Sequence, residues 1–163
     1  MKDLSDFVAL LGRMEMFSGM TDREIETVLI DSGAISRDYE KNSIILRQGD
    51  EYTRLAIVLE GSCTSEMNDY SGRTLSLGRF RAPFPVAPGF LFLEKGSLPV
   101  SLRALTFAKV LFVAREGLFH HLQNNRVFLH DFLGLLSNRI EYLTERVSFH
   151  SCRTIREKLL LYL

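Results

Sequence analysis

Short apolar runs separated by turn residues fill the middle of the chain, from residue 35 to residue 113. Many of these runs alternate apolar and polar side chains, which is the period of a half-buried β-strand. The strands that this pattern predicts are 35–39, 44–46, 55–59, 63–67, one that begins near 75, 100–105 and 109–113. Several short strands at roughly even spacing favour an antiparallel barrel or jelly roll.

Helical spacing replaces this alternation at both ends of the chain. Apolar residues from Leu4 to Leu11 recur at the period of a helix. Thr21 and Glu24 form a capping box, which predicts the start of a second helix. From Glu116 onward the helical period returns. The sequence therefore predicts an α+β fold, a β-roll with N-terminal helices and a long C-terminal helix.

The long C-terminal helix carries two apolar stripes. The first stripe has heptad spacing, alternately four and three residues, and comprises Leu129, Leu133, Leu136, Ile140, Leu143, Val147, His150 and Thr154. The second stripe comprises Phe128, Phe132, Leu135, Tyr142 and Phe149. A sustained heptad seam is typical of a two-stranded coiled coil. We expect the first stripe to form a homodimer through its residues 129–150, and the second to pack on the roll. The alternative is one broad face buried within a monomer.

Composition excludes several classes of protein. Twenty basic and twenty acidic residues cancel, so the chain lacks the basic excess of a domain that grips nucleic acid by itself. No apolar run reaches the ~18 residues of a membrane span, and the N-terminus is not built like a signal peptide. Cys63 and Cys152 form no CxxC motif, which indicates reduced thiols in a cytoplasmic protein. All four histidines follow residue 119, outside the predicted strands, so no enzymatic metal site of the β-roll type is expected.

The order of elements and a set of short motifs resemble the Crp/Fnr family of bacterial transcription regulators. The motifs are Leu46-x-x-Gly49-Asp50, Leu55-x-x-Val58-Leu59-x-Gly61, Gly72, Val100-x-x-Arg103-Ala104 and Ser137-x-Arg139-Ile140. The resemblance implies a cyclic-nucleotide-binding-type roll over residues 1–123 and a dimerisation helix over 124–152. It also implies that 153–163 begin a DNA-binding domain, through which alone DNA would be contacted. A second capping box, Thr154 to Glu157, agrees with a new helix there.

The chain departs from the family at the phosphate cassette. Nucleotide-binding members carry a Gly-Glu pair and, about eleven residues later, Arg-Ser or Arg-Thr. Counting back from Val100, the second pair falls on Leu98-Pro99 and the first on Ala87-Pro88. These positions offer no cation, and proline has no amide hydrogen to donate to a phosphate. We therefore expect no cyclic nucleotide in the usual pose. The N-terminal cysteines of the iron–sulfur branch are also absent.

The proline pattern of residues 83–92 resembles the family branch that regulates nitrosative-stress genes, including hybrid-cluster-protein regulators. This resemblance implies a haem that senses nitric oxide, bound between the roll and the long helix. The expected contacts are Phe84, Val86, Ala87, Pro88, Phe90, Leu91, Phe92 and Leu98, with Leu143 and Thr144 from the helix. Haem iron takes His, Met, Cys or Tyr, and the candidates are Met67 and His150, then Tyr70 and Cys152. The alternatives are another small apolar effector, a cavity filled by its own aromatic side chains, or a dimerisation module without a ligand.

Overall fold

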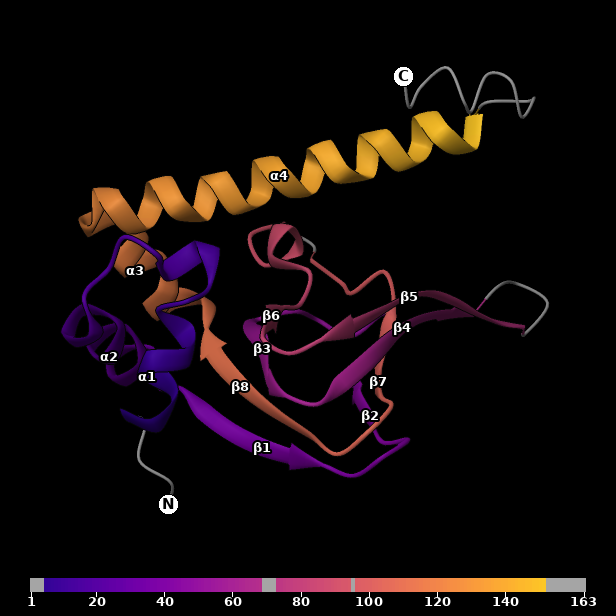
Figure 1. Ribbon diagram of the computed structural model, residues 1–163, viewed down its shortest axis with the longest axis horizontal. Helices are drawn as coiled ribbons and strands as arrows, with labels where there is room; N and C mark the ends of the chain where they lie inside the picture. The colour runs from indigo at the N-terminus through magenta and orange to yellow at the C-terminus, as the bar shows by residue number, and fades with distance from the viewer. Residues whose placement is uncertain (1–4, 69–72, 95, 152–163) are drawn as a thin grey trace.

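The computed structural model describes residues 5–68, 73–94 and 96–151, and they form a roll of two antiparallel sheets (Figure 1). The first sheet has the strand order β1(Ile35–Tyr39)–β8(Ala108–Ala114)–β3(Arg54–Glu60)–β6(Phe84–Pro85). The second has the order β2(Ile44–Leu46)–β7(Ser101–Ala104)–β4(Ser62–Asn68)–β5(Thr74–Arg81). The predicted jelly roll and the α+β class are confirmed, and each predicted strand lies within two residues of an observed one.

Helices flank the roll on both sides in sequence (Figure 1). Before it lie α1(Ser5–Leu11), the 3₁₀ turn η1(Glu15–Phe17) and α2(Asp22–Asp31), and after it α3(Arg115–Asn124) and α4(Arg126–Ser151). The predicted capping box is present at α2, where the Thr21 amide donates to the Glu24 carboxylate at 2.8 Å. This hydrogen bond lowers the pKa of Glu24.

The strands β3 and β8 are buried on both faces, because the first sheet is covered on both sides. Leu55 and Ile57 point into a core shared with the N-terminal helices, whereas Ala56 and Val58 point between the two sheets. Adjacent residues of a strand face opposite sides of its sheet. This is why residues 55–59 are continuously apolar, whereas most of the other strands are not.

The first half of α4 is anchored to η1. Phe128 is fully buried and stacks on Phe17 with ring centroids 5.3 Å apart, and Phe132 is only 2% exposed. The Asp131 carboxylate accepts a hydrogen bond from the Gly19 amide at 2.8 Å. The second apolar stripe therefore packs against its own chain at Phe128 and Phe132. The predicted partner was the roll, whereas Phe128 contacts η1, which precedes the roll, and Tyr142 of the same stripe is 47% exposed.

The heptad stripe of α4 stays open in the single chain. Its exposed members are Leu129, Leu133, Ile140, Leu143 and Val147, each at least 40% exposed. The alternative of one broad face buried within a monomer is therefore wrong for these residues. The His150 side chain and the predicted joint and domain at 152–163 lie outside the described residues. Among the described residues, no helix has both the length and the apolar character needed to cross a bilayer.

Candidate functional site

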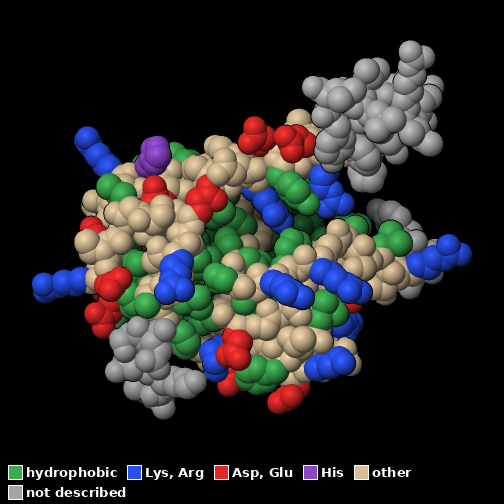
Figure 2. Space-filling view, in the orientation of Figure 1, with side chains coloured by type: hydrophobic (Ala, Val, Ile, Leu, Met, Phe, Trp, Pro, Cys, Tyr) green, Lys and Arg blue, Asp and Glu red, His purple; other side chains and the backbone are tan. Residues whose placement is uncertain are grey.

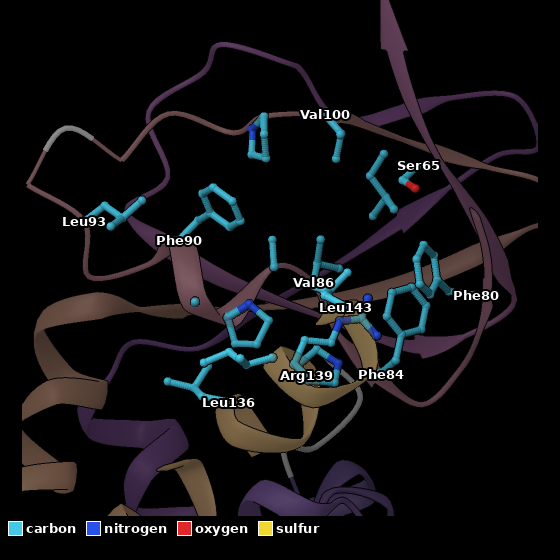
Figure 3. A pocket seen from close by; sticks show the side chains of 17 residues that line it. Ser65, Phe80, Phe84, Val86, Phe90, Leu93, Val100, Leu136, Arg139 and Leu143 are labelled. Carbon is cyan, nitrogen blue, oxygen red and sulfur yellow. The ribbon is translucent and has the colours of Figure 1, made fainter. Parts of the chain in front are cut away.

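A cavity of about 570 Å³ lies between the roll and α4 (Figures 2 and 3). Figure 2 shows it as a hollow beneath α4 with hydrophobic side chains inside and cations at the rim. Its volume falls within the range of about 300–1,000 Å³ that is typical of small-molecule sites. The lining residues are Ser65, Phe80, Phe84, Pro85, Val86, Ala87, Pro88, Gly89, Phe90, Leu93, Pro99, Val100, Leu102, Leu136, Arg139, Ile140 and Leu143.

The wall formed by residues 84–90 is held to β3 by a buried tyrosine. The Tyr52 hydroxyl donates to the Val86 carbonyl at 2.6 Å and accepts from the Ala56 amide at 3.0 Å. The Val86 amide donates to the Ala56 carbonyl at 2.8 Å. Burial raises the pKa of Tyr52, so its hydroxyl keeps its proton and acts as a fixed hydrogen-bond bridge.

Ala87 sets the direction in which the wall turns. Its backbone is left-handed, with φ 44° and ψ 47°, and it caps the short 3₁₀ turn η2(Pro88–Phe90). This conformation costs a non-glycine residue about 1–2 kcal/mol. The surrounding hydrogen bonds and packing must offset that cost, which agrees with a wall of defined shape.

The opposite wall comes from α4, through Leu136, Arg139, Ile140 and Leu143. Figure 3 shows the Arg139 side chain reaching from the helix toward the rings of Phe80 and Phe84. Its guanidinium lies 5.6 Å from the centroid of the Phe80 ring. Arg139 is the one charged side chain among the described residues that line the cavity.

Six of the predicted contact residues line the cavity: Phe84, Val86, Ala87, Pro88, Phe90 and Leu143. The cassette positions Ala87 and Pro88 are thus part of the wall, and Pro99 joins them from the second cassette pair. Arg103 lies elsewhere, since it pairs with Glu66 at 2.9 Å. Arg103 therefore does not supply the missing phosphate ligand to the cavity.

The other predicted contacts do not line the cavity. Leu98 and Leu91 are buried in the core beside the helices. Phe92 turns toward Phe119 and Phe132, with ring centroids 5.7 and 5.9 Å away. Thr144 is exposed and its hydroxyl donates to the Ile140 carbonyl at 2.8 Å. Sequence alone could not assign the directions of Leu91, Phe92 and Leu98, because residues 91–98 follow no regular period.

Met67 also lies away from the cavity, on β4 opposite Leu75 of β5. Tyr70, Cys152 and the side chain of His150 fall outside the described residues. The described walls hold no His, Met, Cys or Tyr, the residue types that ligate haem iron. Within the described part of the chain, no group of three His, Cys, Asp or Glu side chains could hold a metal ion. These walls therefore do not fit a haem ligated inside the cavity.

Sequence reasoning missed eleven of the lining residues. They are Ser65, Phe80, Pro85, Gly89, Leu93, Pro99, Val100, Leu102, Leu136, Arg139 and Ile140. Leu136 and Ile140 had been assigned only to the dimer seam. Val100 and Leu102 occupy alternate positions of the predicted strand 100–105, which was a usable signal. Arg139 was visible only as part of a family motif.

A family model and the solved structures of other proteins both support the fold. The family model described as the cyclic nucleotide-binding domain matches residues 36–125. The chain is similar to a transcriptional regulator from Thermotoga maritima, with 25% identity and a TM-score of 0.69 over 78% of this chain and 97% of that one. A search of curated proteins found no match.

Two further structures share the fold at lower identity. The sensor domain of the transcriptional regulator DNR from Pseudomonas aeruginosa is 15% identical, with a TM-score of 0.75 over 95% of this chain and 99% of that one. The catabolite activator protein of Thermus thermophilus is 20% identical, with a TM-score of 0.72 over 85% of this chain. The match spans only 63% of that activator's length.

Proposed function

Because the chain belongs to the cyclic nucleotide-binding domain family, we propose that it is the effector-sensing and dimerisation portion of a Crp/Fnr-type transcription regulator. The observation that carries this proposal is the cavity of about 570 Å³ enclosed between the roll and α4. The helix that walls the cavity also presents an open heptad stripe, so one element can both touch an effector and join two chains.

The effector is a small, mainly apolar molecule rather than a cyclic nucleotide in the usual pose. At the cassette positions the cavity presents Ala87, Pro88 and Pro99, which offer a phosphate no cation and, at both prolines, no amide hydrogen. A polar group that is buried against these residues without a hydrogen-bond partner loses its hydration, at a cost of several kcal/mol.

Haem is the more specific prediction from the sequence, and the described walls supply no ligand for its iron. We therefore favour the alternative of another apolar effector. A hemin titration followed by absorption spectroscopy separates the two. We expect no spectrum of ligated haem at stoichiometric hemin. A ligated spectrum that Met67→Ala or His150→Ala abolishes would overturn this preference.

The proposed regulator acts as a homodimer through α4, with DNA contacted by a domain that follows the helix. Ile140 and Leu143 belong both to the cavity wall and to the heptad stripe. An effector in the cavity therefore touches residues that the second chain also meets. This regulation requires two arrangements of the α4 helices in the dimer. Effector binding can shift the dimer from one arrangement to the other only if the two differ in affinity for the effector.

The cavity itself is tested with N-phenyl-1-naphthylamine, a neutral apolar dye that fluoresces when it leaves water. We expect the full chain to bind the dye. Val100→Trp, which fills part of the cavity, should weaken binding at least about tenfold. Ile30→Trp is the matched control, because Ile30 is 59% exposed on α2 and does not line the cavity.

Two results would contradict the proposed site. The first is dye binding that is equally strong in Val100→Trp and in the unaltered chain. The second is tight calorimetric binding of cyclic AMP or cyclic GMP, because the cassette positions Ala87, Pro88 and Pro99 offer no group that holds a phosphate in the usual pose.

A further inference from the structure

Two polar side chains stand in an otherwise apolar cavity. Ser65 of β4 contributes a hydroxyl and Arg139 of α4 contributes a guanidinium, and the other lining side chains are hydrocarbon or glycine. Figure 3 shows both groups at the edge of the same space. In small-molecule sites, a few polar groups among apolar walls usually fix the orientation of the ligand.

Arg139 has no counter-ion within the described ranges. No carboxylate of those ranges lies within ion-pair distance of it, whereas Arg103 and Arg115 each have one. Its contacts are with two aromatic rings, Phe80 and Tyr142, whose centroids each lie 5.6 Å from the guanidinium. The negatively charged faces of the rings stabilise the guanidinium above them. The five N–H donors of the guanidinium lie in its own plane and point away from the rings, so they remain available to a ligand.

The position of Arg139 determines what those donors can reach. Phe80 packs on Phe84 with ring centroids 5.1 Å apart, and both rings line the cavity. The guanidinium therefore sits at an aromatic end of the cavity, next to a space lined by hydrocarbon. Arg139 itself is exposed at the rim of the cavity, so an anion bound there would be shielded from water on the cavity side, and the apolar surroundings on that side strengthen a charge-assisted, bidentate hydrogen bond.

We propose that the effector is an amphipathic anion, with an aromatic or alicyclic body in the apolar cavity and an acidic group bound by Arg139. This inference rests on the proposed function, because it names the chemical class of the effector at that same site. A cyclic nucleotide fits this class poorly. Its sugar and base edges need several hydrogen-bond partners, and the described walls offer the side chains of Ser65 and Arg139 alone.

A matched pair of dyes tests the charge. 8-Anilinonaphthalene-1-sulfonate has the same anilinonaphthalene body as N-phenyl-1-naphthylamine plus one sulfonate. In the full chain we expect the anionic dye to bind the cavity, with Val100→Trp weakening both dyes. Arg139→Gln should weaken the anionic dye about tenfold, which is the low end expected for a hydrogen bond to a charged group. The neutral dye should change less than about twofold.

Two further variants separate charge from shape. Arg139→Lys keeps the charge without the planar fork and should retain part of the preference for the anionic dye. Arg146→Gln is the control, because Arg146 also lies over Tyr142, at 5.8 Å, but does not line the cavity. It should leave both dyes unchanged. Circular dichroism of each variant checks that the fold is retained.

The outcomes distinguish the two levels of the proposal. If Arg139→Gln weakens both dyes equally or neither, the anionic effector is refuted while the cavity remains a binding site. If Val100→Trp weakens neither dye, the cavity is not the site and the proposed function fails as well. Displacement of the anionic dye by cyclic AMP at micromolar concentration would refute the exclusion of nucleotides.

Discussion

Removing one hydroxyl group, by Tyr52→Phe, should loosen the wall of the cavity without disturbing the packing around the ring. Tyr52 is 2% exposed, and its hydroxyl bridges the Ala56 amide of β3 and the Val86 carbonyl of the cavity wall. Ala56 is fully buried and Val86 is 7% exposed. Phenylalanine fills the same space as tyrosine, so the change isolates these two hydrogen bonds.

The cost follows from the two backbone groups that lose their partner. A buried donor or acceptor left unsatisfied costs about 1–3 kcal/mol. The Ala56 amide and the Val86 carbonyl would both be affected, and the Val86 amide would keep its own bond to the Ala56 carbonyl. Because that remaining bond limits how far the strands can shift to compensate, we expect the two costs to add, to a total loss of about 2–6 kcal/mol.

Equilibrium denaturation in urea measures this loss as a lower midpoint with an unchanged slope. Tyr39→Phe is the matched control, because it also removes one tyrosine hydroxyl from a residue with an aromatic neighbour. Tyr39 is half-buried on β1, and its ring centroid lies 6.5 Å from that of Phe112 in an edge contact. The control should change stability by less than about 0.5 kcal/mol. A Tyr52→Phe loss no larger than that of the control would refute the bridge. Dye binding should weaken alongside stability, because Val86 lines the cavity.

Three more changes test other parts of the structure. Leu133→Asp, at a 52% exposed seam position outside the cavity lining, should turn a dimer into a monomer in sedimentation, whereas Glu145→Lys off the seam should not. A dimer that survives Leu133→Asp would refute the seam. Gly49 and Gly61 share nearly the same backbone angle, φ +88° and +90°, but a Cβ at Gly61 would lie 2.1 Å from a backbone oxygen and one at Gly49 would meet nothing within 4 Å. Gly49→Ala should therefore cost about 1–2 kcal/mol and Gly61→Ala at least about twice that; equal losses in urea denaturation would contradict the clash. Burial raises the pKa of Asp131, but hydrogen bonds from Gly19 and Ser18 and the nearby His130 lower it overall. The resulting stability is present above the usual carboxyl pKa and is lost as the pH falls through the lowered value. The difference in stability between the unaltered chain and Asp131→Asn should then shrink as the pH falls below the usual Asp pKa of about 3.9. A difference that does not depend on pH would refute the stabilising role of the ionised Asp131.

The sequence predicted the architecture well because its signals are local. Residues 55–59 form an apolar run between two turns, and the hydrogen bonds at Thr21 follow directly from its spacing to Glu24. The two stripes of the long helix were separated correctly in its first half, where Phe128 and Phe132 are buried and Leu129 and Leu133 are exposed. In its second half the prediction was wrong for Tyr142, which is 47% exposed. Each of these features depends on residues that lie close together in the sequence.

The site was predicted only in part because its walls come from segments without a period. Ala87 takes a left-handed conformation that sequence does not signal for alanine, and the chain direction after it decides which side chains face the cavity. Phe90 therefore lines the cavity, whereas Phe92 packs on Phe119 outside it. Arg139 was missed because its place in the wall depends on how α4 lies across the roll, which is a tertiary property.

The way α4 is held suggests where an effector could act. Its first half is fixed to η1 by Phe128, Phe132 and Asp131, so a change in the cavity cannot easily displace it. Beyond Leu136 the helix is held by few buried side chains, and Ile140 is 65% exposed although it lines the cavity. A ligand with equal contacts in two helix positions would shift nothing, however tightly it bound. The regulation we propose therefore requires contacts to the second half of α4 that differ between the two positions. By linkage, dimerisation must then change effector affinity by the same factor as the effector changes dimerisation.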